Sequence, residues 1–274
     1  MRVPTCSRHF LAAVALVLVS TGARAGLSYT LTSRSEGEAG QGGYEMRLDV
    51  LVSGGAAKAV FTTPPPGMSA GSWLVTQDGG GKTLVVDPGA KTYSEFSAGQ
   101  LQSDVAAMQK AMGPLKMRTE NVKVEDLGEE DGGTIEGFPA KHHRFRVSYD
   151  RTMKLPMVKR SMHTVIEDEL WTTSAVADAG TGIWKLPPPK VPDGEGAEDL
   201  AAAYGKAGGF LLKLSRKTSS TGGHGDRSST ETLAVTEVKK ADVPPETFAI
   251  PAGFTETQGG MMRPQGGSQM PDLK

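Results

Sequence analysis

The sequence predicts an α+β protein built mainly from antiparallel β-strands, and three features indicate this class. Short apolar runs alternate with polar residues at a period of two, as in strands with one buried face. Glycine accounts for 35 of the 274 residues, and its clusters separate the runs in the manner of tight turns. In two places the apolar period lengthens to three or four residues, which is typical of helices.

The N-terminus has the features of a secretory signal peptide. Basic residues precede the apolar run 10–19, and Ala23-Arg24-Ala25 follows it. A run of ten residues is about half of the roughly 20 needed to cross a bilayer. We therefore expect residues 1–25 to be removed after Ala25, leaving a periplasmic or secreted chain without a transmembrane segment. The single cysteine, Cys6, precedes the run, so neither lipidation nor a disulfide is expected in the mature chain.

The first half of the mature chain reads as successive strands. Segment 44–53 is the clearest, because Tyr44, Met46, Leu48 and Val50 alternate with charged residues. The remaining strands are expected over 27–35, 57–63, 73–75, 82–87 and 91–96.

Segment 72–96 is a meander with two turns. Glycines at 79–81 can adopt the positive φ of a tight hairpin, and Asp87-Pro88-Gly89 places proline and glycine at favoured turn positions. We place this meander at the centre of the sheet.

A helix is expected over 100–112, where the period changes. Its apolar stripe recurs every three or four residues and ends at Gly113-Pro114. The helix either seals the sheet as ordinary core or forms a mobile lid over a ligand. The stripe consists of Leu101, Val105, Met108 and Met112.

The second half returns to strands. They are expected over 121–126, 134–151 and 160–173, with the first reversal at Asp131-Gly132-Gly133. A short second helix over 198–207 precedes the last hairpin, which begins at Phe210.

The C-terminal part is expected to dock on the sheet and then to become disordered. Phe248, Ile250 and Phe254 are spaced between prolines and can anchor an extended segment. We expect residues 26–256 to form one domain and residues 257–274, which lack any period, to be a disordered tail.

Motifs for catalysis are weak. His142, His143 and His163 precede Asp168, so a metal site is conceivable, but consecutive histidines on a strand point to opposite faces. Solvated surface histidines explain the same pattern, and we predict no metal site. The mature chain lacks both a nucleophile elbow and a thiol, and no glycine cluster ends in a phosphate-cradle lysine. We expect no catalytic residues, no cofactor and no enzymatic activity.

The order of elements resembles a known family. The features are the turn and strand DPGAKTYSEF, a helix directly after it, the strand ending in ELW, a second helix and the closing VPPETFAIPAGF. Together they resemble the lipoprotein-carrier superfamily of LolA and LolB, and most of all a secreted branch of unknown function within it. The resemblance spans residues 27–256, whereas the proline-rich loops and the long tail depart from the carriers.

The resemblance implies a curved antiparallel half-barrel with one or two helices covering its concave, apolar face. In the carriers, the space between sheet and helices accommodates acyl chains. The corresponding ligand-lining residues would be Tyr44, Met46, Leu48, Val50 and Trp73 on the sheet, with Leu101, Val105, Met108 and Met112 on the covering helix.

Two functions follow as hypotheses. The first is a soluble periplasmic protein that binds a lipid, an acyl group or the acyl chains of a lipoprotein. The second is an envelope interaction or sensing protein with the same fold, a filled interior and a protein partner. A nucleic-acid partner is not expected, because the net charge is −1 and no basic stripe with interleaved aromatics occurs.

Overall fold

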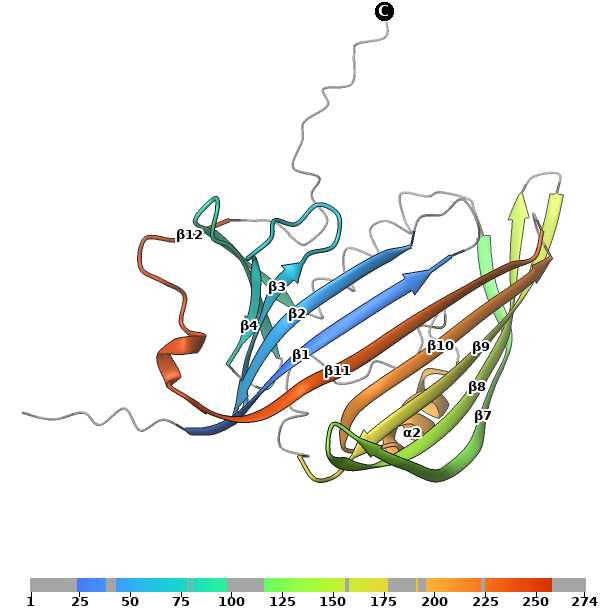
Figure 1. Cartoon of the computed structure of the whole chain (residues 1–274). Helices are drawn as coiled ribbons and strands as arrows, with labels where there is room; N and C mark the ends of the chain where they lie inside the picture. The colour runs from blue at the N-terminus through green and yellow to red at the C-terminus, as the bar shows by residue number, and fades with distance from the viewer. Residues whose placement is uncertain are drawn as a thin grey trace, which may run out of the picture.

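The structure is a computed structural model, and it describes residues 24–37, 43–77, 79, 81–97, 116–155, 158–176, 191, 196–222 and 225–257. Within these residues a single 12-stranded sheet organises the chain (Figure 1). The predicted signal segment up to residue 23, helix 100–112 and the tail beyond residue 257 lie outside the described residues. Arg24 and Ala25 are the first two residues of the first strand.

The elements follow one another along the chain with few interruptions. They are β1 (Arg24–Glu36), β2 (Tyr44–Ser53), β3 (Ala56–Thr63), β4 (Trp73–Thr76), β5 (Lys82–Asp87), β6 (Thr92–Ser97), β7 (Lys116–Ile135), β8 (Phe138–Leu155), β9 (Val158–Thr173), α2 (Ala197–Lys206), β10 (Phe210–Gly222), β11 (Arg227–Val243), the 3₁₀ turn η3 (Pro245–Phe248) and β12 (Thr255–Glu256).

The strand order is β12-β6-β5-β4-β3-β2-β1-β11-β10-β9-β8-β7. Neighbours pair antiparallel except for the short β12, which lies parallel to β6. The prediction that 72–96 forms the centre of the sheet is wrong, because β4 to β6 lie towards one edge. The two central strands are instead β2 and β1, and β1 also pairs with β11.

The reversal between β7 and β8 also differs from the prediction. The strand continues through Asp131-Gly132-Gly133 as a bulge, where the Asp131 carboxylate accepts a hydrogen bond from the Gly133 N–H at 2.8 Å. The chain reverses at Glu136-Gly137, where both residues have positive φ, 52° and 80°. A two-residue hairpin loop of this kind needs positive φ at both positions, and the glycine supplies one of them readily.

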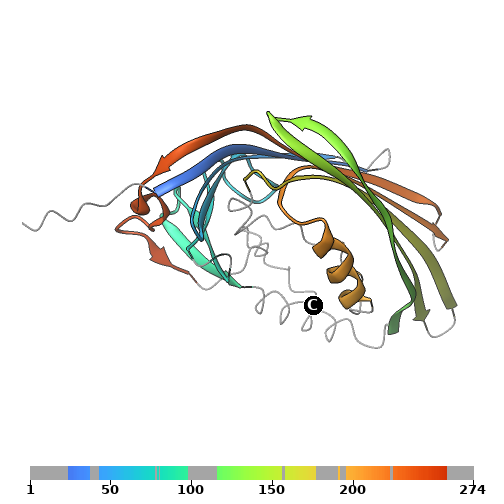
Figure 2. The same cartoon turned by 90° about the horizontal axis from the view of Figure 1, so that it is seen from below.

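The sheet is strongly curved, and its two ends bend towards the side on which α2 lies (Figure 2). Cross-strand partners share a face, so the register assigns side chains to the concave or the convex side. Leu31 pairs with Leu48, and Leu48 pairs with Phe61, all on the concave side. The predicted class, a curved antiparallel sheet with a helix on its concave face, is confirmed.

The C-terminal segment docks on the opposite, convex face. Phe248 of η3 is buried there with Val75, Val86 and Val243, and the Gln77 side chain donates a hydrogen bond to the Phe248 carbonyl at 2.8 Å. Ile250 and Phe254 pack against the same cluster. The predicted anchoring role of these three apolar residues is therefore confirmed.

Candidate functional site

An apolar cluster covers the concave side of the sheet from β1 to β4 and reaches β10. Leu48 and Val50 lie at its centre and are almost fully buried. Tyr29 packs edge-on against Phe210 with ring centroids 5.2 Å apart, which joins this half of the sheet to the half beneath α2. The other buried members are Leu31, Val52, Ala57, Ala59, Phe61, Leu74, Ala140, Leu212 and Val235.

The predicted ligand-lining residues fall into three groups. Leu48 and Val50 belong to this concave cluster, and Met46 packs against it. Tyr44, at the start of β2, is 45% exposed. Leu101, Val105, Met108 and Met112 lie outside the described residues.

Trp73 requires a correction. It pairs with Val60 and Val86 on the convex face, and its ring lies 6.0 Å from that of Phe254. Alternation along β4 turns its neighbour Leu74 to the concave cluster instead. Trp73 therefore does not share a face with Leu48 and Val50.

Helix α2 covers the other half of the concave face, over β7 to β10. Its apolar stripe is Leu200, Ala203, Tyr204 and Ala207, which pack against Phe145, Val147 and Leu214 among others. The Tyr204 ring stacks on Phe145 with centroids 4.6 Å apart. The existence and the apolar face of this helix are as predicted.

Beneath α2 lies a buried charged cluster that was not among the predicted sites. Asp168 is 1% exposed and accepts a bidentate pair of hydrogen bonds from Arg216, with Nε to Oδ1 at 2.9 Å and Nη2 to Oδ2 at 2.7 Å. The Tyr204 hydroxyl donates to the same carboxylate at 2.5 Å. Asp168 stands between Ile166 and Leu170 on the apolar face of β9, and this break in the apolar alternation is the only sequence signal for it.

The cluster changes how readily its members lose protons. Burial raises the pKa of Tyr204 above its ordinary value, and the charge and hydrogen bond of Asp168 raise it further. Burial opposes the charge on Arg216, but Asp168 outweighs it, so the pKa of Arg216 is also raised. Both groups stay protonated, so the cluster acts as a fixed tie between α2 and the sheet rather than as an acid or base.

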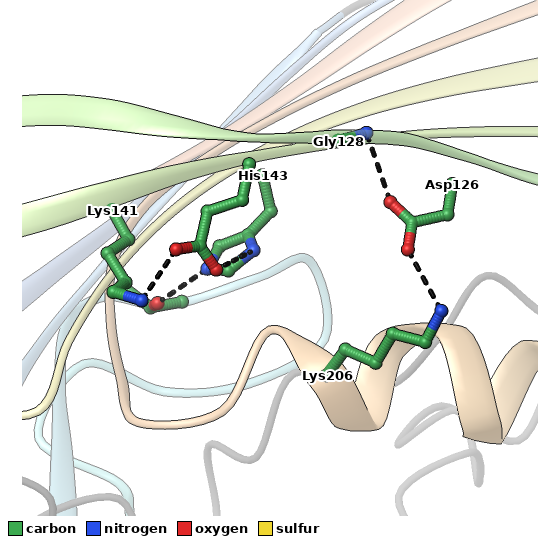
Figure 3. A network of polar contacts seen from close by, with 7 residues as sticks. Asp126, Gly128, Lys141, His143 and Lys206 are labelled. Carbon is green, nitrogen blue, oxygen red and sulfur yellow. Dashed lines mark hydrogen bonds and ion pairs between the residues drawn. The ribbon is translucent and has the colours of Figure 1, made fainter.

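A second polar network lies beside α2 at the β7 edge (Figure 3). Lys206 of α2 donates to Asp126 at 3.1 Å, and this bond, with that from the Gly128 N–H, holds the pKa of Asp126 below its ordinary value. Next to it, the buried His143 lies 3.2 Å from the Thr172 hydroxyl and 3.5 Å from Glu129. Edge strand β7 is thus joined to both α2 and β8.

His143 gives a pH-dependent prediction. Burial lowers the pKa of His143 below its ordinary value of 6.5 and outweighs the carboxylates of Glu129 and Asp126. The unfolded chain therefore takes up this proton first, so the contribution of His143 to stability is complete above about pH 6.5 and is lost as the pH falls below it. We expect His143→Gln to flatten the decrease in unfolding free energy between about pH 7.5 and pH 5.5, measured by urea denaturation. An unchanged slope would contradict this assignment.

The histidines do not gather into one site. His142 stacks on Trp171, with ring centroids 4.2 Å apart, whereas His143 points to the other face of β8 and His163 contacts Asp150. In the part of the chain that the structure describes, no group of three or more His, Cys, Asp or Glu is placed to hold a metal ion.

Among the pockets that the described residues line, we consider two that open on the sheet. The first, of about 410 Å³, lies at the ends of β1, β2 and β11 and is lined by Leu27, Val52 and Val176 together with polar residues of β2 and β11. The second, of about 390 Å³, is polar and lies over Thr30, Asp49 and Lys58 on the convex face. The first pocket adjoins the apolar concave cluster, which Leu27 and Val176 also contact.

Comparisons with known proteins find similar structures but no similar sequence. No family model and no curated protein matches the chain. The chain is structurally similar to a LolA superfamily protein, NE2245, from Nitrosomonas europaea, with 12% identity and a TM-score of 0.32 over 82% of this chain and 90% of that one. A DUF1329 family protein from Desulfovibrio piger matches at 8% identity and a TM-score of 0.32 over 84% and 91%.

A putative outer membrane lipoprotein-sorting protein domain from Vibrio parahaemolyticus matches at 10% identity and a TM-score of 0.24, over 80% of this chain and 86% of that one. Among the described helices, none is long and apolar enough to span a membrane.

Proposed function

We propose that the protein is an exported, non-enzymatic carrier that binds a lipid or acyl chain on the concave face of its sheet in the periplasm. The observation that supports this most is the extent of the apolar concave cluster. It continues over β1 to β4, beyond the strands that α2 covers, and a pocket of about 410 Å³ opens at its end. Pockets for small molecules typically measure about 300–1,000 Å³ and are mainly apolar.

Affinity would come from burying the apolar chain, at about 25 cal/mol per Å² before the costs of ordering the ligand. Met46, Leu48 and Val50 would form the sheet side of the site, with Tyr44 at its exposed end. Leu101, Val105, Met108 and Met112 would form the helical side, as the sequence predicts. Removal of residues 1–25 on export, a single domain over 26–256 and a disordered tail remain parts of this proposal.

A second candidate is supported by a specific observation. Leu48 and Val50 are 0% and 1% exposed, so this part of the concave face is already covered. A filled interior would suit an envelope interaction or sensing protein that contacts a protein partner, with no lipid.

Recovery of the full chain from an envelope fraction, followed by native mass spectrometry and lipid extraction, distinguishes the two. We expect a co-purifying acyl lipid, and we expect Leu27→Gln to reduce its occupancy because Leu27 lies on the concave side beside the pocket. Ser28→Gln is the matched control, because Ser28 is the neighbouring residue on the opposite face. Repeated absence of lipid from the unaltered protein would favour the second candidate.

A further inference from the structure

The apolar concave cluster is covered in part by the tip of the β7–β8 hairpin. Ile135 and Phe138 lie opposite each other at the ends of the two strands, are partly buried and pack against the cluster. The turn between them, Glu136-Gly137, is exposed. Because the members of the cluster are themselves buried, an acyl chain can reach them only where a covering segment moves.

One hydrogen bond ties this tip to β11. The Glu136 carboxylate accepts it from the backbone N–H of Glu237 at 2.7 Å, although the two residues are 101 positions apart. Glu237 lies in an irregularity of β11, where the β1–β11 register shifts between Ser28 and Thr30, and beyond the last pair of the β10–β11 ladder. The irregular backbone therefore presents an N–H to the tip instead of to a neighbouring strand.

Both partners of this hydrogen bond have a backbone conformation that residues with side chains seldom adopt. The φ angle is 52° at Glu136 and 57° at Glu237. Backbone strain of this kind persists where the surrounding structure holds it, and it is often found in segments that switch between positions. The contact therefore differs from the regular sheet pairing around it.

The hairpin also has a place to bend just before its tip. The register of β7 shifts between Asp131 and Thr134, where Gly132-Gly133 lies. In β8, Pro139 faces Thr134 and has no N–H to donate to the ladder. Residues 133–139 are all exposed or only partly buried. An interrupted ladder and few buried contacts are typical of segments that open locally.

We infer that the hairpin tip, residues 134–139, is a lid on the apolar concave cluster, closed by the hydrogen bond between Glu136 and Glu237 and opened when an acyl chain binds. This inference rests on the proposed function and adds the route by which the ligand enters. The lid adjoins the pocket of about 410 Å³, because β11 continues from Glu237 to Lys240, which lines that pocket. A ligand opens a lid only if it binds the open form more tightly, and burial of its chain in place of the two covering side chains would provide this difference.

The first test is hydrogen exchange of the Glu237 amide, measured by NMR spectroscopy on the delipidated full chain after its export. The closed lid protects this amide, because its N–H is bound to Glu136. We expect laurate to raise its exchange rate about fivefold or more, together with the rates of the amides in 134–138. Acetate, which has no acyl chain, should leave these rates unchanged.

The second test is the association rate of laurate with two variants at one position. Glu136→Ala removes the acceptor and should raise this rate about fivefold, because loss of one hydrogen bond changes the opening equilibrium by about that factor. Glu136→Gln is the matched control, since its amide oxygen can still accept the hydrogen bond, and its rate should stay close to that of the unaltered protein.

A merely structural contact would respond differently. Glu136→Ala would then leave the association rate of laurate unchanged, and bound laurate would leave the Glu237 amide protected. This result would overturn the lid and leave the proposed function intact. If laurate does not bind the unaltered protein at all, the proposed function is overturned and the lid with it.

Discussion

Replacing Asp168 by alanine is expected to lower the unfolding free energy by about 3–5 kcal/mol. The change leaves the Arg216 guanidinium, whose side chain is 16% exposed, without the carboxylate that holds it at 2.7 Å. It also removes the acceptor of the Tyr204 hydroxyl and so loosens α2 from the sheet. Urea denaturation followed by far-UV circular dichroism measures the effect.

The control for this prediction is the neighbouring residue on the other face. Glu167 contacts Arg146 at 2.7 Å, the same separation, but both side chains are 45% exposed. Exposed ion pairs contribute about 0–1 kcal/mol, so Glu167→Ala should have a small effect. Similar losses for Asp168→Ala and Glu167→Ala would refute the buried-cluster account, whereas Asp168→Leu combined with Arg216→Met should recover much of the stability.

Replacing Phe248 by alanine is expected to destabilise the protein by about 3–5 kcal/mol, the usual range for a buried phenylalanine. Phe248 is 4% exposed and holds the C-terminal segment against Val75 and Val86. Its loss should also increase protease cleavage after Val243, because the following segment has few other buried contacts. Unfolding by urea and limited proteolysis measure the two effects.

Glu246→Ala serves as the control in the same 3₁₀ turn, because Glu246 is exposed. It should change the unfolding free energy by less than about 0.5 kcal/mol. A stable Phe248→Ala variant with unaltered protease sensitivity would show that the segment after β11 is not part of the fold.

Most strands could be predicted because their signals are local. Segment 44–53 alternates from Tyr44 to Val50, and the observed β2 has the bounds predicted for the segment. The order of strands could not be predicted, because β1 and β11 are about 200 residues apart in sequence. No residue pattern in either strand indicates which strand it pairs with. The reversal between β7 and β8 was predicted at Gly132-Gly133 instead of Glu136-Gly137, because a pair of glycines is compatible with a β-bulge as well as with a turn.

The site could be predicted only in part. Alternation places Met46, Leu48 and Val50 on one face, but strand pairing alone decides that Trp73 lies on the other. Leu27, Val52 and Lys240 come to one pocket through the pairing of β1 with both β2 and β11, so no spacing in the sequence indicates this pocket. Asp168 could have been predicted to be unusual, because it is a charged residue within the apolar face of the strand over 160–173, and a buried charge requires a partner.

The most direct test is to map where an acyl chain binds. The delipidated full chain would be irradiated with a laurate analogue that carries a diazirine at its chain end, then digested and analysed by mass spectrometry. We predict adducts on concave-side residues of β1 and β2, such as Leu31 and Leu48, which unlabelled laurate suppresses. Adducts confined to the convex face around Trp73 and Phe254, or labelling that unlabelled laurate does not reduce, would contradict the assignment of the concave face as a ligand-binding surface.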